Sequence, residues 1–179
     1  MPEQLLPFDV EQYTRGRLSQ TDPETTRLLS AALARARRYC GWHVSPVITE
    51  TITLDGHGDR FLPLPTKRIG AVIGIDVDGV PIDLSEVQQH GSTLIRWIWP
   101  CGYANIAVEF THGYSAAEAA DFREAVLRMV DQSASIAAEG GTLVSKTVDD
   151  VSYRWASGQD LDPGVAAILA PFRRLWAAV

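Results

Sequence analysis

The sequence predicts an α+β protein in which a helical scaffold carries an antiparallel β module between its helices. Two stretches, residues 8–41 and 115–139, repeat apolar side chains at helical spacing. Residues 47–111 instead alternate apolar and polar side chains, and they are rich in β-branched residues and turn signals. A polar segment at 142–158 and a last helical stretch at 162–177 follow. We expect all 179 residues to form one domain.

The N-terminal helices are predicted from the residues at their ends. Thr21-Asp22-Pro23-Glu24 fits a capping box in which Thr21 is the cap and Glu24 reaches back to it. Gly41 is suited to the left-handed conformation that ends many helices. Between these ends an apolar face repeats at helical spacing, formed by Leu29, Ala32, Leu33, Ala36 and Cys40.

The β module is predicted from alternation and from its turns. Asp78-Gly79 lies between two β-like runs and is a strong hairpin signal. Residues 61–65 contain two prolines, so they are expected to form an edge strand. We expect residues 93–99 and 105–111 to pair with each other around Pro100-Cys101-Gly102.

Helical spacing returns after the β module. Ser115-Ala116-Ala117-Glu118 is a second capping-box candidate, and Gly140-Gly141 ends the helical pattern. The following segment, 142–158, contains a β-like stretch and is interpreted as a loop or arm. Asp162-Pro163 is expected to start the last helix, which Pro171 should kink or restart.

Composition narrows the possible functions. The net charge of −6 and the pI near 5.1 argue against a protein that grips nucleic acid by its phosphates, because such binding needs clustered Lys and Arg. No basic, apolar leader and no apolar run of about 20 residues is present, so we expect a soluble protein made in a cytoplasm. Cys40 and Cys101 are expected to be buried thiols in that reducing compartment.

Candidate catalytic and metal sites are sparse. Cys40 and His43 have the spacing of half a metal site, but a second paired motif is missing. Asp55, His57 and Asp59 lie in a glycine-rich turn, whose geometry alone explains these residue types. We expect no enzyme and no cofactor; a small metal-dependent hydrolase using this turn stays open as an alternative.

Aromatic residues gather in the second half of the β module. They are expected to serve core packing and subunit contact, because only Arg96 accompanies them, whereas single-strand binders interleave aromatics with many basic residues. A monomeric module whose β face binds a peptide or single-stranded nucleic acid remains a second alternative. These aromatic residues are Trp97, Trp99, Tyr103, Phe110 and Tyr114.

Four short motifs carry a resemblance to a known family. The first is the helix end Arg38-Tyr39-Cys40-Gly41-Trp42-His43-Val44-Ser45-Pro46. It is followed in order by Leu62-Pro63-Leu64-Pro65, by Thr111-His112-Gly113-Tyr114, and by Ser145-Lys146-Thr147-Val148-Asp149-Asp150-Val151-Ser152-Tyr153, where Asp149 replaces a common glycine. Together they resemble the head-to-tail adaptor proteins of tailed bacteriophages, also called head-completion or connector proteins.

The resemblance implies a noncatalytic structural protein of the virion neck. Family members form a homo-oligomeric ring, usually of twelve copies, below the portal protein. The ring extends the DNA channel, through which double-stranded DNA passes without sequence-specific binding, and provides a platform for the neck or tail-completion (stopper) protein. Such a protein is made in the host cytoplasm, needs no membrane, and has no catalytic residue to transfer.

The resemblance also assigns two candidate contact regions. The C-terminal helix is expected to dock on the portal through Val165, Ile168, Leu169, Phe172, Arg173, Arg174, Leu175 and Trp176. Its aromatic and arginine content is enriched at protein interfaces, although packing on its own domain explains it equally well. The segment 142–158 is expected to be an intersubunit or tail-facing arm using Ser145, Val148, Asp149, Val151, Tyr153 and Trp155.

Overall fold

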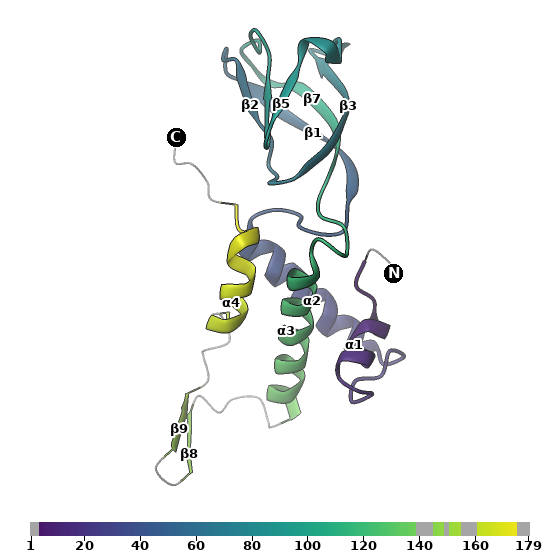
Figure 1. Cartoon of the computed structure of the whole chain (residues 1–179), viewed down its shortest axis with the longest axis vertical. Helices are drawn as coiled ribbons and strands as arrows, with labels where there is room; N and C mark the ends of the chain where they lie inside the picture. Colours follow the sequence, from purple (N-terminus) through teal and green to yellow (C-terminus); the bar gives the residue numbers. More distant parts are fainter. Residues whose placement is uncertain (1–3, 139–144, 149–150, 155–160, 175–179) are drawn as a thin grey trace. The chain divides into compact units, whose positions relative to one another are not determined.

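The computed structural model describes residues 4–138, 145–148, 151–154 and 161–174 (Figure 1). The chain divides into two compact units. The β module is built on Trp42–Ala119, and the helical unit is built on Pro2–Gly41 and Ala120–Arg173. The predicted α+β class is confirmed, and the β module is inserted between the two sequence segments of the helical unit.

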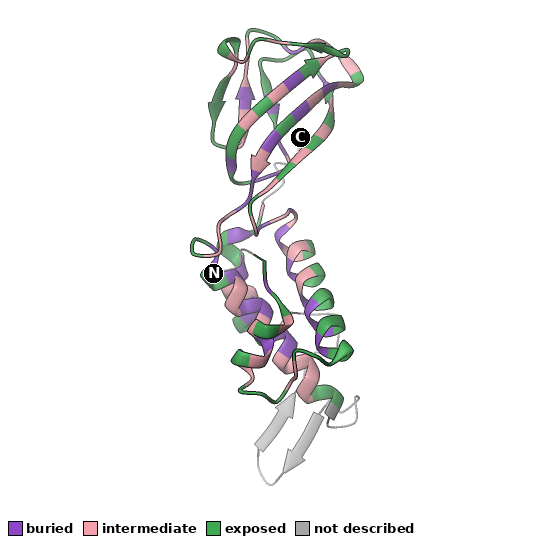
Figure 2. Cartoon of the chain, turned by 90° about the vertical axis from the view of Figure 1, so that its right-hand side faces the viewer, coloured by how far each residue is buried: buried purple, intermediate pink, exposed green. Residues whose placement is uncertain are grey.

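Four α-helices form the helical unit. They are α1 (Pro7–Tyr13), α2 (Pro23–Cys40), α3 (Ala120–Ala138) and α4 (Pro163–Leu169), and a 3-10 turn, η2 (Ala170–Phe172), follows α4. Helix α3 packs against each of the other three. Their buried apolar faces make the core, to which Val10, Leu29, Ala36, Phe122, Val126, Val130, Val165 and Leu169 contribute. Figure 2 shows these buried positions as stripes along the helices.

The ends of α2 show how local chemistry defines the helix. Asp22 caps it in place of the expected Thr21, because the Asp22 carboxylate accepts a hydrogen bond of 2.9 Å from the Glu24 amide. At the other end Gly41 adopts φ 78°, and its amide donates to the Arg37 carbonyl. The predicted helix end at Gly41 is therefore confirmed.

The capping box predicted at Ser115 and Glu118 forms one turn before α3. The Glu118 carboxylate accepts hydrogen bonds from the Ser115 amide at 3.0 Å and from its hydroxyl at 2.8 Å. The Glu118 amide in turn donates to the Ser115 hydroxyl at 3.3 Å. The α-helix itself begins at Ala120, later than the expected 115.

Two antiparallel sheets form the β module. The four-stranded sheet has the order β1-β7-β3-β4 and the three-stranded sheet the order β2-β6-β5. The strands are β1 (Ile48–Gly56), β2 (Phe61–Pro63), β3 (Ile69–Val77), β4 (Val80–Pro81), β5 (Gln88–His90), β6 (Thr93–Ile95) and β7 (Gly102–His112), and a 3-10 turn, η1 (Leu84–Glu86), precedes β5. Both sheets supply one core, formed by Leu62, Leu64, Ile69, Ile75, Leu94, Trp99, Ile106, Val108 and Phe110.

Two of the predicted features of the sheets are confirmed. Asp78 and Gly79 join β3 to β4. Both have positive φ angles, 51° and 77°, as a type I′ hairpin turn requires. Residues Phe61–Pro63 lie at the edge of the three-stranded sheet. Proline is tolerated there because one side of an edge strand needs no donor.

One predicted pairing is wrong. Residues 93–99 were expected to pair with 105–111, but β6 pairs with β2 and β5, and β7 pairs with β1 and β3. The reason is that β7 lies in the middle of the larger sheet, where two long strands already occupy both of its edges. The strand that alternation predicted between Val80 and Leu84 is also shorter, ending at Pro81.

Candidate interaction surfaces

The glycine-rich turn after β1 has a structural role. Asp55 accepts a hydrogen bond of 2.6 Å from the Ala104 amide, and the Asp59 carbonyl accepts one of 2.7 Å from the Trp99 amide. The turn thus joins the end of β1 to the start of β7. Within the described ranges, no group of three or more His, Cys, Asp or Glu side chains is placed to hold a metal ion.

The two cysteines differ in their environments. They form no disulfide; Cys40 is buried at the end of α2, as expected, whereas Cys101 is exposed. The expectation that Cys101 is buried is therefore wrong. It follows Pro100 in the loop before β7, whose apolar anchor is Trp99 and not the thiol.

The aromatic residues of the β module fall into two groups. Trp99 and Phe110 belong to the core, and the Trp99 ring nitrogen donates a 3.1 Å hydrogen bond to the Arg60 carbonyl. Trp97 and Tyr103 are instead 82% and 90% exposed. Strand β6 ends at Ile95, so Trp97 and Trp99 lie in the loop before β7, where strand alternation no longer places residues two apart on one face. Core packing accounts for only part of this cluster.

Four large apolar side chains make an exposed surface on the β module, which we call the aromatic end. It comprises Phe61, Trp97, Ile98 and Tyr103, all between 49% and 90% exposed. The Arg60 carbonyl accepts a hydrogen bond of 3.0 Å from the Arg96 amide, which joins the segment of Phe61 to that of Trp97 and Ile98. Exposed aromatic groups of this kind mark interaction sites on soluble proteins.

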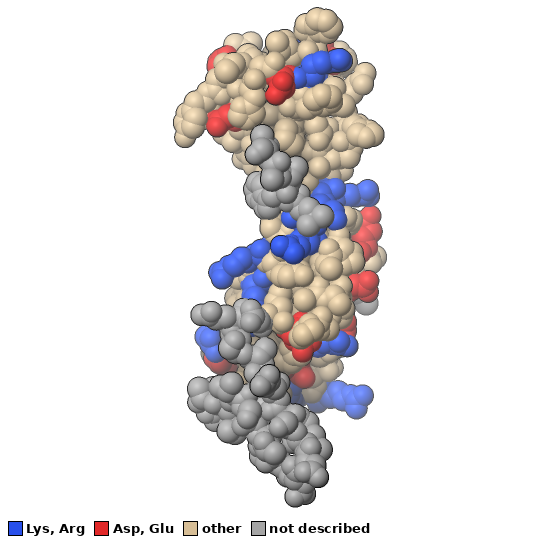
Figure 3. Space-filling model, turned by 90° about the vertical axis from the view of Figure 1, so that its left-hand side faces the viewer, with Lys and Arg blue, Asp and Glu red and all other residues tan. Residues whose placement is uncertain are grey.

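Charge is distributed unevenly along the sequence of the two units. Residues 42–119 contain four Lys or Arg and nine Asp or Glu, so the β module is acidic. Helix α2 alone contains four arginines and a single acidic residue, Glu24, which pairs with Arg27 at 2.5 Å. On the face in Figure 3, most of the Lys and Arg side chains lie over helical elements, and most of the visible β-module surface is uncharged.

The predicted portal-docking residues do not share one surface of the helical unit. Val165, Leu169 and Phe172 are buried in its core, and the Phe172 ring meets the Phe122 ring edge-on at a centroid distance of 5.9 Å. Ile168 is partly exposed and Arg173 is exposed. The Arg173 guanidinium lies over the Tyr39 ring at 5.4 Å. Arg174 is partly buried, while Leu175 and Trp176 lie outside the described residues.

The predicted arm contains a β-hairpin. Strands β8 (Ser145–Val148) and β9 (Val151–Arg154) pair in antiparallel register, with Ser145 opposite Arg154 and Val148 opposite Val151. Ser145, Val148, Val151 and Tyr153 therefore lie on its strands. The predicted arm residues Asp149 and Trp155 lie outside the described part of the chain.

The chain enters and leaves the β module through two adjacent linkers. The Tyr114 amide donates to the Val44 carbonyl at 2.8 Å, and the Trp42 and Tyr114 rings meet edge-on at 5.7 Å. The contact is close enough that a side chain at Gly113 would lie 2.5 Å from the Pro46 carbonyl oxygen. Gly113 has φ 108°, so glycine is required for both reasons.

A buried histidine lies where β7 ends. The His112 ring is 2% exposed, and Glu50 Oε1 lies 2.9 Å from its Nε2. The His43 ring lies 5.6 Å away, and His43 Nε2 is 2.6 Å from the Pro46 carbonyl oxygen. Burial lowers the pKa of His112, and the Glu50 carboxylate partly opposes this shift. The neutral ring is therefore favoured in the folded β module.

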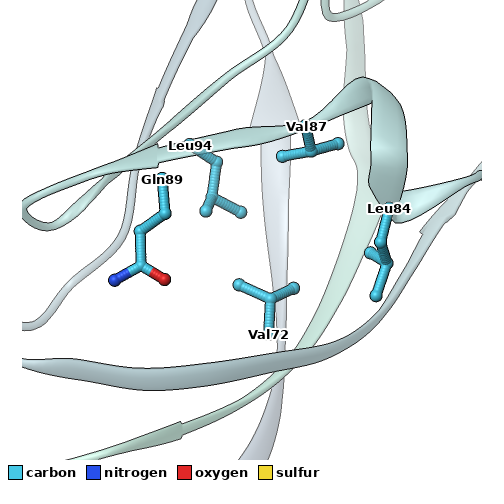
Figure 4. Close-up of a pocket in the computed structure, with 5 residues that line it drawn as sticks. All are labelled: Val72, Leu84, Val87, Gln89 and Leu94. Atoms are coloured by element: carbon cyan, nitrogen blue, oxygen red, sulfur yellow. The ribbon is translucent and has the colours of Figure 1, made fainter.

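A small pocket of about 210 Å³, partly open to solvent and lined mainly by aliphatic side chains, lies between the two sheets of the β module; we call it the cavity. Val72 of β3 faces Leu94 of β6 and Val87 across it, and Leu84 closes one side (Figure 4). Gln89 of β5 is the one polar residue among the five that line it.

Comparison with solved structures relates the whole chain to one kind of particle. A chain from the neck of an empty gene transfer agent (GTA) particle, computed with C6 symmetry, has a TM-score of 0.63 and 15% identity, covering 97% of this chain and 92% of that chain. A chain from the neck of the native GTA particle, computed with C12 symmetry, gives 0.59 and 15%, covering 98% and 96%. A chain from the native GTA virion gives 0.60 and 17%, covering 97% and 92%.

These likenesses show that the fold is shared with chains of a particle neck. No protein-family model matches the sequence. No curated protein sequence matches it either. The link between this chain and the GTA neck chains is therefore a shared fold and not a match between sequences.

The sequence predicted the two surfaces only in part. It assigned all five aromatic residues together to core packing and subunit contact, without separating the exposed Trp97 and Tyr103 from the buried Trp99 and Phe110. It did not find the cavity, because Val72, Val87 and Leu94 come from three segments with no shared pattern. Strand pairing, not local sequence, brings these residues together.

Proposed function

We propose that this chain is a noncatalytic structural subunit of the neck of a tailed, phage-like particle, acting as its head-to-tail adaptor. The supporting observation is the shared fold, which extends over 97% of this chain and 92% of the matched GTA neck chain. Such coverage includes the helical unit, the inserted β module and the helix after the arm. The same order of motifs carries the resemblance to head-to-tail adaptors in the sequence.

In this role the subunit forms a ring below the portal. The C6 and C12 symmetry with which the similar GTA necks were computed supports a ring. The ring would extend the DNA channel and present a platform to the stopper protein. A net charge of −6 suits a channel through which DNA slides, because phosphates are not held by an acidic subunit. Twelve copies and a negative or neutral channel wall are therefore part of the proposal.

The burial pattern of α4 narrows the portal-docking surface. Val165 and Leu169 are buried in the helical core, so a partner cannot reach that face of α4. The described docking candidates that a partner can reach are Ile168, partly exposed on α4, and Arg173, exposed just after η2. Deleting the whole helix would unfold the helical unit, and a surface variant gives the cleaner test.

The test mixes the full chain with the portal ring of the same particle and measures the mass of any complex. We expect the native chain to bind, and Ile168→Asp combined with Arg173→Glu to bind at least about tenfold more weakly, as hot-spot residues do. A matched control, Ile136→Asp with Arg128→Glu, changes an exposed pair on α3 and should bind like the native chain.

Two results would count against the proposal at different levels. If the native chain forms no complex with the portal ring, the adaptor function is wrong. If the α4 variant binds as well as the native chain, the adaptor function stands and the docking surface lies elsewhere.

A further inference from the structure

The cavity of the β module has the size and chemistry of a site for one aromatic side chain. Cavities of about 150 Å³ lined by aliphatic residues bind benzene, so a volume of about 210 Å³ accommodates a larger ring. Val72, Leu84, Val87 and Leu94 provide apolar walls, and no charged side chain lines the space (Figure 4). Burying a ring there therefore desolvates no charge.

Gln89 adds a polar feature to this apolar lining. The Gln89 side chain is exposed at the cavity. No hydrogen bond joins its side-chain amide to another described residue. An aromatic side chain with one polar atom suits this arrangement, since buried Trp and Tyr usually find a hydrogen-bond partner. The Gln89 carbonyl oxygen can accept from an indole N–H.

The same β module offers such a side chain at its aromatic end. Trp97 is 82% exposed, and its neighbours Phe61, Ile98 and Tyr103 extend the apolar surface around it. Tryptophan is the residue most enriched among the few that dominate binding at interfaces. An exposed Trp97 is thus suited to insertion into a partner.

The topology places Trp97 and the cavity on different surfaces of the module. In the three-stranded sheet, β2 and β5 are the opposite edges, with β6 between them. The backbone of Trp97 and its neighbours runs beside β2, because the Arg96 and Trp99 amides donate to Arg60 and Asp59. The cavity lies on the side of β5, which contributes Gln89.

We propose that Trp97 of one copy inserts into the cavity of a second copy, with its indole N–H donating to the Gln89 carbonyl oxygen. The two surfaces differ, so the contact is heterologous and each copy can give one Trp97 and receive another. Repeated around an axis, such contacts close a ring. The inference rests on the proposed function, because a ring of neck subunits is what this contact would build.

Disulfide trapping tests the contact in the full chain. Ile98→Cys, which lies next to Trp97 and leaves the indole in place, is combined with Gln89→Cys in a Cys101→Ser background, since Cys101 is exposed and Cys40 is buried. Mild oxidation of the purified protein should give a ladder of covalent oligomers on a nonreducing gel. Each single-cysteine protein should give no ladder, and a mixture of the two should give dimers only.

A matched control moves the second cysteine by one residue. Gln88→Cys lies on the same strand, but alternation points its side chain to the other face of the sheet. Combined with Ile98→Cys, it should give no ladder. A ladder from this control as strong as that from Gln89→Cys, or no ladder from the Gln89 pair under conditions of native self-association, would overturn the proposal. A native chain that stays monomeric at every concentration would also overturn it.

Noncovalent association provides a second measurement. Trp97→Ala, and Val87→Phe to fill the cavity, should each weaken self-association in sedimentation by about tenfold or more. Tyr103→Ala, which removes another ring of the aromatic end, should weaken it by less than about threefold. Portal binding is measured separately, so loss of the ladder with retained portal binding disproves this contact alone. A ladder without portal binding disproves the adaptor function alone.

Discussion

Helix α4 and the aromatic end of the β module use apolar side chains in opposite ways. In α4, Val165 and Leu169 are fully buried against other helices of the same chain. At the aromatic end, Trp97 and Tyr103 are almost fully exposed. The stretch from α4 to Arg174 and the aromatic end, with Arg60 and Arg96 beside it, both combine apolar residues with arginine, so their compositions alone do not distinguish them.

A composition typical of interfaces therefore indicates that a segment makes contacts. It does not indicate whether those contacts are within the same chain or with a partner chain. The apolar residues of α4 satisfy their contacts inside the helical unit, and they are needed for folding. The side chains of the aromatic end are between 49% and 90% exposed in the β module, so this surface is available for contact with another molecule. Four pairs of measurements test this contrast.

The largest expected effect distinguishes two tryptophans of the same loop. Trp99→Ala removes a side chain that is 1% exposed and its hydrogen bond to Arg60, and it should cost about 3–5 kcal/mol of unfolding free energy. Trp97→Ala should change that free energy by less than about 0.5 kcal/mol. Urea denaturation of the β module measures both, and equal losses would show that Trp97 is a packing residue.

The next effect concerns α4. Leu169→Ala should destabilise the helical unit by about 2–5 kcal/mol, because it opens a cavity in a fully buried site. Ile168→Ala, one residue away and partly exposed, should cost about 1 kcal/mol or less. Far-UV circular dichroism during urea denaturation measures both; a small loss for Leu169→Ala would mean that α4 is not part of the core.

The cap of α4 should have a smaller effect. Asp162 accepts hydrogen bonds from the Gly164 amide at 2.9 Å and the Val165 amide at 3.2 Å. Asp162→Ala should therefore lower the unfolding free energy by about 1 kcal/mol, whereas Asp162→Asn keeps an acceptor and should lose less. Thermal denaturation checks the order of the two variants, and equal losses would exclude capping as the cause.

The smallest expected effect is a pH dependence confined to the β module. Burial lowers the pKa of His112 in the folded state, so its neutral ring contributes stability above the unfolded pKa near 6.5. That contribution is lost as the pH falls through the lower folded pKa. Removing the opposing carboxylate in Glu50→Gln should steepen the loss.

Urea denaturation at about pH 8 and about pH 5 measures this dependence. His112→Gln provides the control, because it removes the titrating ring and should flatten the difference. The helical unit has no histidine in its sequence segments, so it should not share this transition. A steeper dependence in the helical unit would contradict the assignment to His112.

Local chemistry explains which parts of the fold were predictable. Gly41 and the Asp78-Gly79 turn were recognised because positive φ angles select these residue types directly. The pairing of residues 93–99 was not, because alternating strands fit several partners equally well. Which partner forms depends on residues far apart in the sequence, such as Leu62 opposite Leu94.

The candidate surfaces were harder to predict than the elements. The sequence predicted the helix that starts at Asp162-Pro163, and the family resemblance assigned Val165 and Leu169 to portal docking, but neither says whether these side chains meet a core or a partner. Trp97 is exposed because Trp99 is the residue of this loop that is buried in the core. Which of the two tryptophans is buried depends on the folded module as a whole.

The paired linkers at Val44 and Tyr114 make the β module a removable part. Because the chain arrives and departs at hydrogen-bonded neighbours, a few residues of glycine and serine can bridge the gap left by excising the module. The helical unit would then keep its own connectivity. Removing or exchanging the module therefore changes one continuous stretch of sequence, residues 42–119.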